Sequence, residues 1–202
     1  MASIASTTLT ACALGERPSF EDSPTVEGTT TGDPAIDAVL AQLDGVDSAL
    51  FTASYDATQL FGGTQSSVTV TQTGVARRSV TIGQVRYITD GGSNRTCFLD
   101  AQTCDDGIQA AAVSNTGVTP DVAFGDMAKR LRRDAVARVA PSTATTLQIA
   151  GNSATCVDVA VSGGTKQYCV LPDGVIARFR GADLTLELTG YRPAPDETLF
   201  RP

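Results

Sequence analysis

The sequence predicts an α+β fold, in which helices cover one face of an antiparallel sheet. Most of the chain after Ala49 alternates apolar and polar residues with a period of two, which is typical of strands with one buried face. Two other segments repeat apolar residues at helical spacing. Turn-forming residues separate the alternating segments, so consecutive strands are expected to pair antiparallel.

The first helix is expected to begin at Asp33-Pro34, because Asp is a good N-cap and Pro fits the first helical turn. One face of this helix carries apolar residues at helical spacing, namely Ile36, Val39, Leu40 and Leu43. The pattern ends near Gly45, which predicts a short amphipathic helix at the start of the folded domain.

Five strands are expected between this helix and the second one. The first begins at Ala49 and alternates apolar residues (Phe51, Ala53, Tyr55, Ala57) with polar ones (Thr52, Ser54, Asp56). Further strands are expected around residues 68–70, 80–82, 85–89 and 97–99, and Asp90-Gly91-Gly92 supplies a turn.

Thr119-Pro120-Asp121 predicts the start of the second helix, which should close before Pro141. Its apolar face contains Phe124, Met127, Ala128, Leu131 and Ala135. Its basic residues are Lys129, Arg130, Arg132 and Arg133, which we interpret as a solvated face. Contacts with anionic lipid headgroups are the alternative.

The last third of the chain predicts a meander of short strands at 145–150, 155–161, 166–171, 175–180 and 184–190. Each gap contains residues that accept a positive φ or fix a turn, as in Pro172-Asp173-Gly174. In the last strand Leu184, Leu186 and Leu188 alternate with polar residues, so one face of the sheet is apolar.

The N-terminus contains Leu9-Thr10-Ala11-Cys12, which looks like the lipobox of a bacterial lipoprotein signal. Residues 1–12 are therefore interpreted as a truncated signal ending at Cys12, the lipidation site. The segment has no Lys or Arg and is short for a signal, so an ordinary Cys is the alternative. Residues 13–32 are polar and Pro-, Gly- and Thr-rich, which predicts a flexible tether, and 33–202 form one domain.

The remaining four cysteines, Cys97, Cys104, Cys156 and Cys169, predict disulfides and an oxidising compartment. Four thiols allow three pairings. Short separations favour Cys97 with Cys104 and Cys156 with Cys169. A zinc site is the weaker alternative, because structural zinc ligands are usually two to four residues apart.

The composition disfavours several classes of function. The chain has 15 Lys and Arg against 22 Asp and Glu, a net charge of -7, so nucleic acid is not an expected partner. It has no histidine, the commonest general base and metal ligand. We therefore expect no catalysis and no cofactor or metal.

In element order the chain resembles the LolA/LppX/LprG-type envelope lipoproteins. The resemblance spans about 33–202 and depends on the opening strand at 50–55, the segment at 87–91 and the terminal Asp-Glu-x-Leu-Phe at 196–200. It implies a strongly curved antiparallel sheet, an open half-barrel, covered by two or three helices. It also implies a membrane-anchored extracytoplasmic protein that binds or carries an acylated ligand in the concave face, or else a sensor for another envelope protein.

Burial of acyl chains on an apolar concave surface is worth about 25 cal/mol per Å². Ten apolar side chains are the candidates to line such a trough: Phe51, Tyr55, Val68, Val70, Val80, Ile82, Tyr87, Phe124, Met127 and Leu131. The alternative is that they fill a closed core, since alternation and helical stripes indicate burial before they indicate a ligand.

Overall fold

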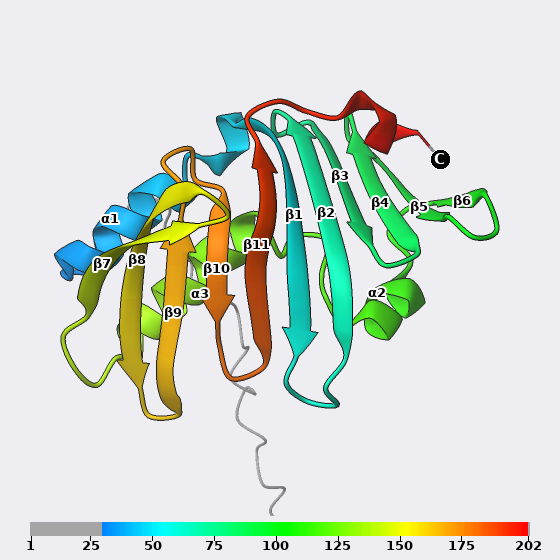
Figure 1. Cartoon of the computed structure of the whole chain (residues 1–202). Helices are drawn as coiled ribbons and strands as arrows, with labels where there is room; N and C mark the ends of the chain where they lie inside the picture. The colour runs from blue at the N-terminus through cyan, green and yellow to red at the C-terminus, as the bar shows by residue number, and fades with distance from the viewer. Residues whose placement is uncertain (1–29, 202) are drawn as a thin grey trace, which may run out of the picture.

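An eleven-stranded antiparallel sheet forms the body of the computed structural model, which describes residues 30–201 (Figure 1). The strands are β1 (Leu50–Gln59), β2 (Gln65–Thr73), β3 (Arg77–Ile82), β4 (Val85–Asp90), β5 (Ser93–Phe98), β6 (Thr103–Asp106), β7 (Thr143–Ile149), β8 (Asn152–Val161), β9 (Gly164–Val170), β10 (Ile176–Arg180) and β11 (Leu184–Arg192). The helices are α1 (Pro34–Leu43), α2 (Ala110–Thr116), α3 (Gly125–Val136) and the 3-10 turns η1 (Val46–Ser48) and η2 (Glu197–Phe200).

The sheet consists of two meanders, β1 to β6 and β7 to β11, joined through the pairing of β1 with β11. Its order is β6-β5-β4-β3-β2-β1-β11-β10-β9-β8-β7, so β6 and β7 are unpaired edges and the sheet does not close. Figure 1 shows the sheet arched, with α1 and α3 on its far side. The expected α+β open half-barrel is confirmed.

The core lies between the concave face of the sheet and the helices. Alternate residues of β1, such as Phe51 and Tyr55, are buried there together with the apolar stripe of α1. Asp33 caps α1 as expected, because its Oδ1 accepts hydrogen bonds from the amides of Ala35 (3.0 Å) and Ile36 (3.4 Å).

The second expected helix begins later than the sequence predicts. Residues 118–124 form hydrogen-bonded turns, and α3 starts only at Gly125. The helix α2 and the short strand β6 were not predicted. The α2 segment is short and lacks a side-chain N-cap, so its sequence contains no clear helix pattern. Gly117 caps its C-terminus with a φ of +62°, a conformation that suits glycine.

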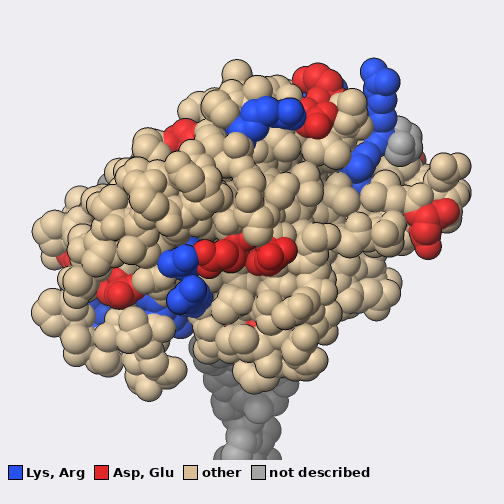
Figure 2. Space-filling view, viewed as in Figure 1, with Lys and Arg blue, Asp and Glu red and all other residues tan. Residues whose placement is uncertain are grey.

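The C-terminal segment crosses the outer, convex face of the sheet near one end (Figure 1). The Thr52 hydroxyl donates to the Ala194 carbonyl (2.9 Å), and the Asp196 amide donates to Thr71 Oγ1 (2.9 Å). Figure 2 shows this face with few charged side chains.

Among the described helices, none is long and apolar enough to span a membrane.

Both expected disulfides are present. Cys97 is bonded to Cys104 across β5 and β6, and Cys156 to Cys169 across β8 and β9. Each bridge joins directly opposite residues of neighbouring strands, so it ties one hairpin. The expected signal with Cys12, and the tether up to residue 29, lie outside the described residues.

Candidate functional site

The structure brings all ten expected trough residues together in one cluster on the concave side of the sheet. Seven come from β1 to β4 and three from α3 and the turn before it. Each is at most 3% exposed. The rings of Phe51 and Phe124 lie 6.3 Å apart, so sheet and cover are in direct contact. In this conformation the ten side chains pack against one another and the rest of the core; their role as ligand contacts stays a prediction.

Helix α3 is held against the rest of the domain by three polar contacts. Arg132 pairs with Asp44, which follows α1 (2.5 Å). Arg130 pairs with Asp183 at the β10–β11 turn (2.9 Å). Thus α3 is attached both to α1 and to the sheet margin.

The third contact is the most buried. Asp134, 3% exposed, accepts hydrogen bonds from the Tyr168 hydroxyl and from Lys166 Nζ (2.6 Å), both on β9. Burial, together with the hydrogen bond to Asp134 and its negative charge, raises the pKa of Tyr168 above its ordinary value. Tyr168 therefore stays a hydrogen-bond donor, which matches the acceptor that the Asp134 carboxylate provides.

The interpretation of the basic residues of α3 as a solvated face is wrong for two of them. Arg132 is only 8% exposed and Arg130 is partly buried, whereas Lys129 and Arg133 are exposed. Charges next to an apolar stripe can be buried when a partner arrives from another element, and the sequence gives no sign of that partner.

Arg78 is a residue that the sequence reasoning missed. Its guanidinium lies 4.3 Å from the centroid of the Phe124 ring, and its Nε donates to Gln72 Oε1 (2.8 Å). The alternation of residues in β3 could have identified it, because Arg78 shares a face of the strand with the apolar Val80 and Ile82. A cation on the apolar face of a strand needs partners, and here the Phe124 ring, the Gln72 amide and the Asp47 carboxylate supply them.

A small cavity opens at the rim of the half-barrel, between the β1–β2 turn and the residues before α3. Its volume is about 260 Å³. The apolar part of its lining is Val118, Val122 and Leu184, and the polar part includes the Arg130–Asp183 pair. Phe61, 77% exposed, also lines it. We call this the rim cavity.

The end of α2 is closely docked against β1 at the rim cavity. Gln59 Nε2 donates to the Thr116 carbonyl (3.1 Å), and a Cβ at Gly117 would lie 1.5 Å from the same nitrogen. Glycine at position 117 suits the positive φ, and a Cβ there would displace the Gln59 side chain from its hydrogen bond to Thr116.

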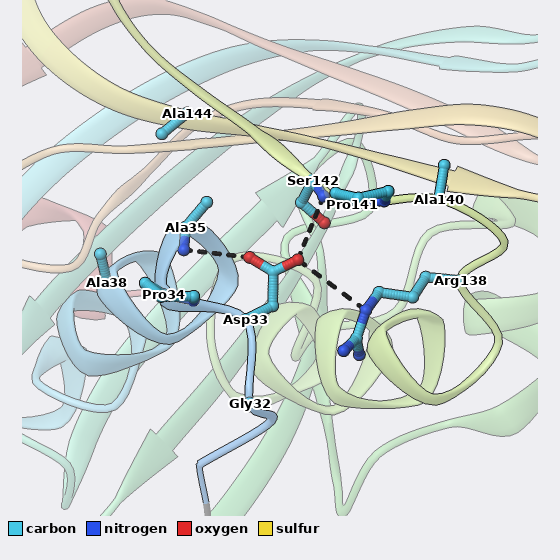
Figure 3. A pocket seen from close by; sticks show the side chains of 10 residues that line it. All are labelled: Gly32, Asp33, Pro34, Ala35, Ala38, Arg138, Ala140, Pro141, Ser142 and Ala144. Carbon is cyan, nitrogen blue, oxygen red and sulfur yellow. Dashed lines mark hydrogen bonds and ion pairs between the residues drawn. The ribbon is translucent and has the colours of Figure 1, made fainter.

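A wider hollow of about 870 Å³ lies between the start of α1 and the start of β7 (Figure 3). The Asp33 carboxylate in it accepts from the amides of Ala35 and Ser142 (3.1 Å) and lies 3.8 Å from Arg138 Nε. Most of the other residues around it are small, namely Gly32, Pro34, Ala35, Ala38, Ala140, Pro141 and Ala144. We call this the α1–β7 hollow.

Within residues 30–201 no group of three or more acidic or cysteine side chains is arranged to hold a metal ion. Buried polar groups without a partner do occur on the concave side, where the hydroxyls of Tyr55 and Tyr87 have no hydrogen bond. Burial raises the pKa of Tyr55, and the negative charge of Asp173 raises it further.

Comparison with known proteins shows similarity in structure only. No family model and no curated protein matches the sequence significantly. A crystal structure of MucB aligns with a TM-score of 0.59 and 12% identity, covering 85% of this chain and 64% of MucB. The complex of MucA and MucB from Pseudomonas aeruginosa aligns with a TM-score of 0.55 and 13% identity, covering 83% of this chain and 60% of the other.

The chain therefore spans less than two thirds of the MucB chains that it matches. A looser match is the Mycobacterium tuberculosis lipoprotein LppX, with a TM-score of 0.42 and 14% identity, covering 81% of this chain and 98% of LppX. At such identities the likeness concerns the fold. The described residues thus form an open half-barrel, a fold similar to that of MucB.

Proposed function

We propose that this chain is a non-catalytic binding domain of the cell envelope whose partner is another polypeptide, bound at the rim of the half-barrel. The observation that carries the proposal is the filled concave face. All ten residues expected to line a trough are buried among the protein's own side chains. A domain with a closed core recognises its partner through its surface.

A stored acyl chain fits this conformation poorly. Ligand pockets usually have volumes of about 300–1,000 Å³. The rim cavity has about 260 Å³, and the α1–β7 hollow, with about 870 Å³, is lined by none of the ten expected trough residues. To enlarge the rim cavity, α3 would have to leave the sheet, which breaks the contacts of Arg130, Arg132 and Asp134. The carrier function expected from the resemblance therefore needs a second, open conformation.

The rim offers what a protein partner needs. Leu60 and Phe61 are exposed at the β1–β2 turn, Phe61 by 77%, beside the apolar lining of the rim cavity. Aromatic side chains next to a small desolvated pocket are typical of residues that dominate binding energy. One solved structure with this fold is a complex of MucB with MucA, which supports a polypeptide as the partner.

Location outside the cytoplasm is part of the proposal. Two disulfides in a chain of 202 residues are typical of an oxidising compartment. Lipidation at Cys12 would hold the domain at the outer face of the cell membrane, with residues 13–32 as the tether.

Site-specific photo-crosslinking in intact cells tests the proposed partner. A photoreactive phenylalanine analogue replaces Phe61, and Val75, exposed at the β2–β3 turn, is the matched control position. We expect one reproducible protein adduct from position 61 and none from position 75. The adduct should disappear in a variant that also carries Leu60→Glu. Labelling of lipid alone, or equal adducts from both positions, would contradict the proposal.

Carriage of an acylated ligand is the second candidate, favoured by the apolar lining of the rim cavity next to α3. Native mass spectrometry of protein purified from its own membranes, with lipid extraction, tests it. A bound lipid, with saturable uptake of a fluorescent fatty acid that increases in Asp183→Asn because the Arg130 contact is weakened, would favour carriage. If neither bound lipid nor saturable uptake of the fatty acid is found, carriage is contradicted and binding of a polypeptide partner is favoured.

A further inference from the structure

The edge strand β7 lacks the features that usually protect a sheet edge. Its pattern is exposed at five of seven positions, Thr143 to Thr146 and Gln148, and no described strand pairs with its outer side. Residues 139–157 contain no Asp, Glu, Lys or Arg. Native edges are commonly blocked by charges, bulges or proline within the strand, and β7 has none of these.

The opposite edge of the sheet is protected. Strand β6 has only four residues, and it ends in two exposed carboxylates, Asp105 and Asp106. The Cys97–Cys104 bridge also ties it to β5. One edge of the sheet, β6, is thus protected against pairing with another strand, and the other edge, β7, is not.

Exposed apolar and small residues flank β7 in two directions, with the Arg138–Asp33 pair between them. Before the strand, the Val139 amide donates to the Ala160 carbonyl (2.9 Å), so the edge continues past Pro141. Val136 and Val139 are exposed by 90% and 67%. On the concave side lies the α1–β7 hollow (Figure 3), next to the exposed alanines Ala38 and Ala41 of α1.

We propose that β7 pairs antiparallel with β7 of a second copy of this chain, about a two-fold axis perpendicular to the sheet. Such pairing joins two eleven-stranded sheets into one and satisfies the outer backbone groups of both edges. It also places both α1 helices on the same side of the joined sheet, with their small exposed residues toward the junction.

A second copy can occupy this edge without charge repulsion at the strand junction. Each copy carries a net charge of -7, so two copies repel unless they meet through an uncharged surface. A two-fold axis through β7 places every residue of the strand opposite an uncharged one, and cross-strand threonine pairs are favourable. The same operation at β6 would bring the carboxylates of Asp105 and Asp106 close to their equivalents.

One strand edge supplies only part of the roughly 1,200–2,000 Å² that stable interfaces bury. The exposed valines at 136 and 139 and the outer face of α1 must therefore contribute. This gives two independent places at which a substitution should weaken the dimer.

Sedimentation velocity of the full chain over a range of concentrations tests the proposal. The background is Cys12→Ser, which removes the thiol that could form an unrelated disulfide dimer. We expect a monomer–dimer equilibrium. Thr145→Lys on β7, and separately Ala38→Glu on α1, should each raise the dissociation constant at least tenfold. Ser67→Lys, the same type of charge change on exposed β2, should leave it unchanged.

Cross-linking locates the contact. In the same background, Thr146→Cys near the middle of β7 should form an intermolecular disulfide under mild oxidation, and Asp105→Cys on β6 should not. A monomer at all concentrations, or a dimer that responds equally to Ser67→Lys, overturns the proposal. Adducts at Phe61 should persist in Thr145→Lys, so failure of this proposal and of the proposed function are distinguishable.

Discussion

Asp33 holds three segments together with one carboxylate. It caps α1, accepts from the Ser142 amide before β7 and faces Arg138. Burial alone would raise the pKa of Asp33, but the hydrogen bonds from Ser142, Ile36 and Ala35 outweigh it and hold the pKa below its ordinary value. The ionised form is therefore the one that stabilises the fold.

Asp33→Asn should lower the free energy of unfolding by about 1 kcal/mol at pH 7, because Asn still caps the helix but loses the charge-assisted bond to Ser142. Since the pKa is lower in the folded state, the stabilisation by Asp33 is complete above about pH 4 and is lost as pH falls through the folded pKa. Urea unfolding at pH 7 and pH 3 should show a smaller difference between the variant and the native protein in acid. An equal difference at both pH values would contradict this, and Asp56→Asn, at an exposed position, is the control.

Tyr168→Phe should destabilise the domain by about 1.5–3 kcal/mol, the usual range for a hydrogen bond to a charged group. The substitution removes the hydroxyl that donates to the buried carboxylate of Asp134 and leaves Lys166 as its remaining partner. Thermal and urea unfolding measure the change. Tyr191→Phe removes a similar bond to Asp173 at a partly exposed position and should cost less. Equal effects would show that burial of Asp134 does not matter.

For single residues, the sequence predicted burial correctly where burial follows from periodicity. The four apolar residues of α1 and the ten expected trough residues are all buried. The prediction failed for Arg78 and Arg132, because a charge at an apolar position is explained only by a partner from another element: Phe124 for the first, Asp44 for the second. Those partners are distant in sequence.

At the scale of elements, the two disulfides tie adjacent strands in the two halves of the sheet. Cys156 and Cys169 are fully buried near the middle of the second meander, whereas Cys104 is partly exposed at the β6 edge. The two bridges therefore differ in what surrounds them although both join neighbouring strands.

Replacing Cys156 and Cys169 together by Ala should cost about 3 kcal/mol from loop closure, with a further loss from the buried sulfurs. The Cys97→Ala/Cys104→Ala pair closes a shorter loop, spans an edge strand and should cost less. Urea unfolding of both double variants measures the order. The opposite order would mean that the β5–β6 hairpin matters more to the native state than its edge position indicates.

Elements with a strong local pattern were predicted well, and those without one were missed. The N-cap and apolar stripe of α1 gave its bounds closely, whereas α3 begins at Gly125 because residues 118–124 pack as turns along the rim cavity. The short α2 depends on the docking of its end by Gln59. That contact is tertiary and leaves no local signature.

At the scale of the whole molecule, anchoring is the expectation most open to direct test. Cys12→Ala, in cells that produce the chain with a complete signal, should release the protein from the membrane fraction into the soluble envelope fraction. Fractionation followed by immunoblotting measures this. Unchanged membrane association would contradict lipidation at Cys12, and Cys97→Ala/Cys104→Ala, which leaves Cys12 intact, should stay with the membranes.

Short-range periodicity, turn residues and cysteine spacing were enough to predict the antiparallel sheet and its apolar face and to favour the two observed disulfide pairs. They could not predict whether the concave face is a trough or a core. That depends on how closely α1, α3 and the turns before α3 approach the sheet, through pairs such as Arg132 with Asp44 and Phe51 with Phe124. Periodicity indicates that a side chain is buried, and only the packing of distant segments determines what buries it.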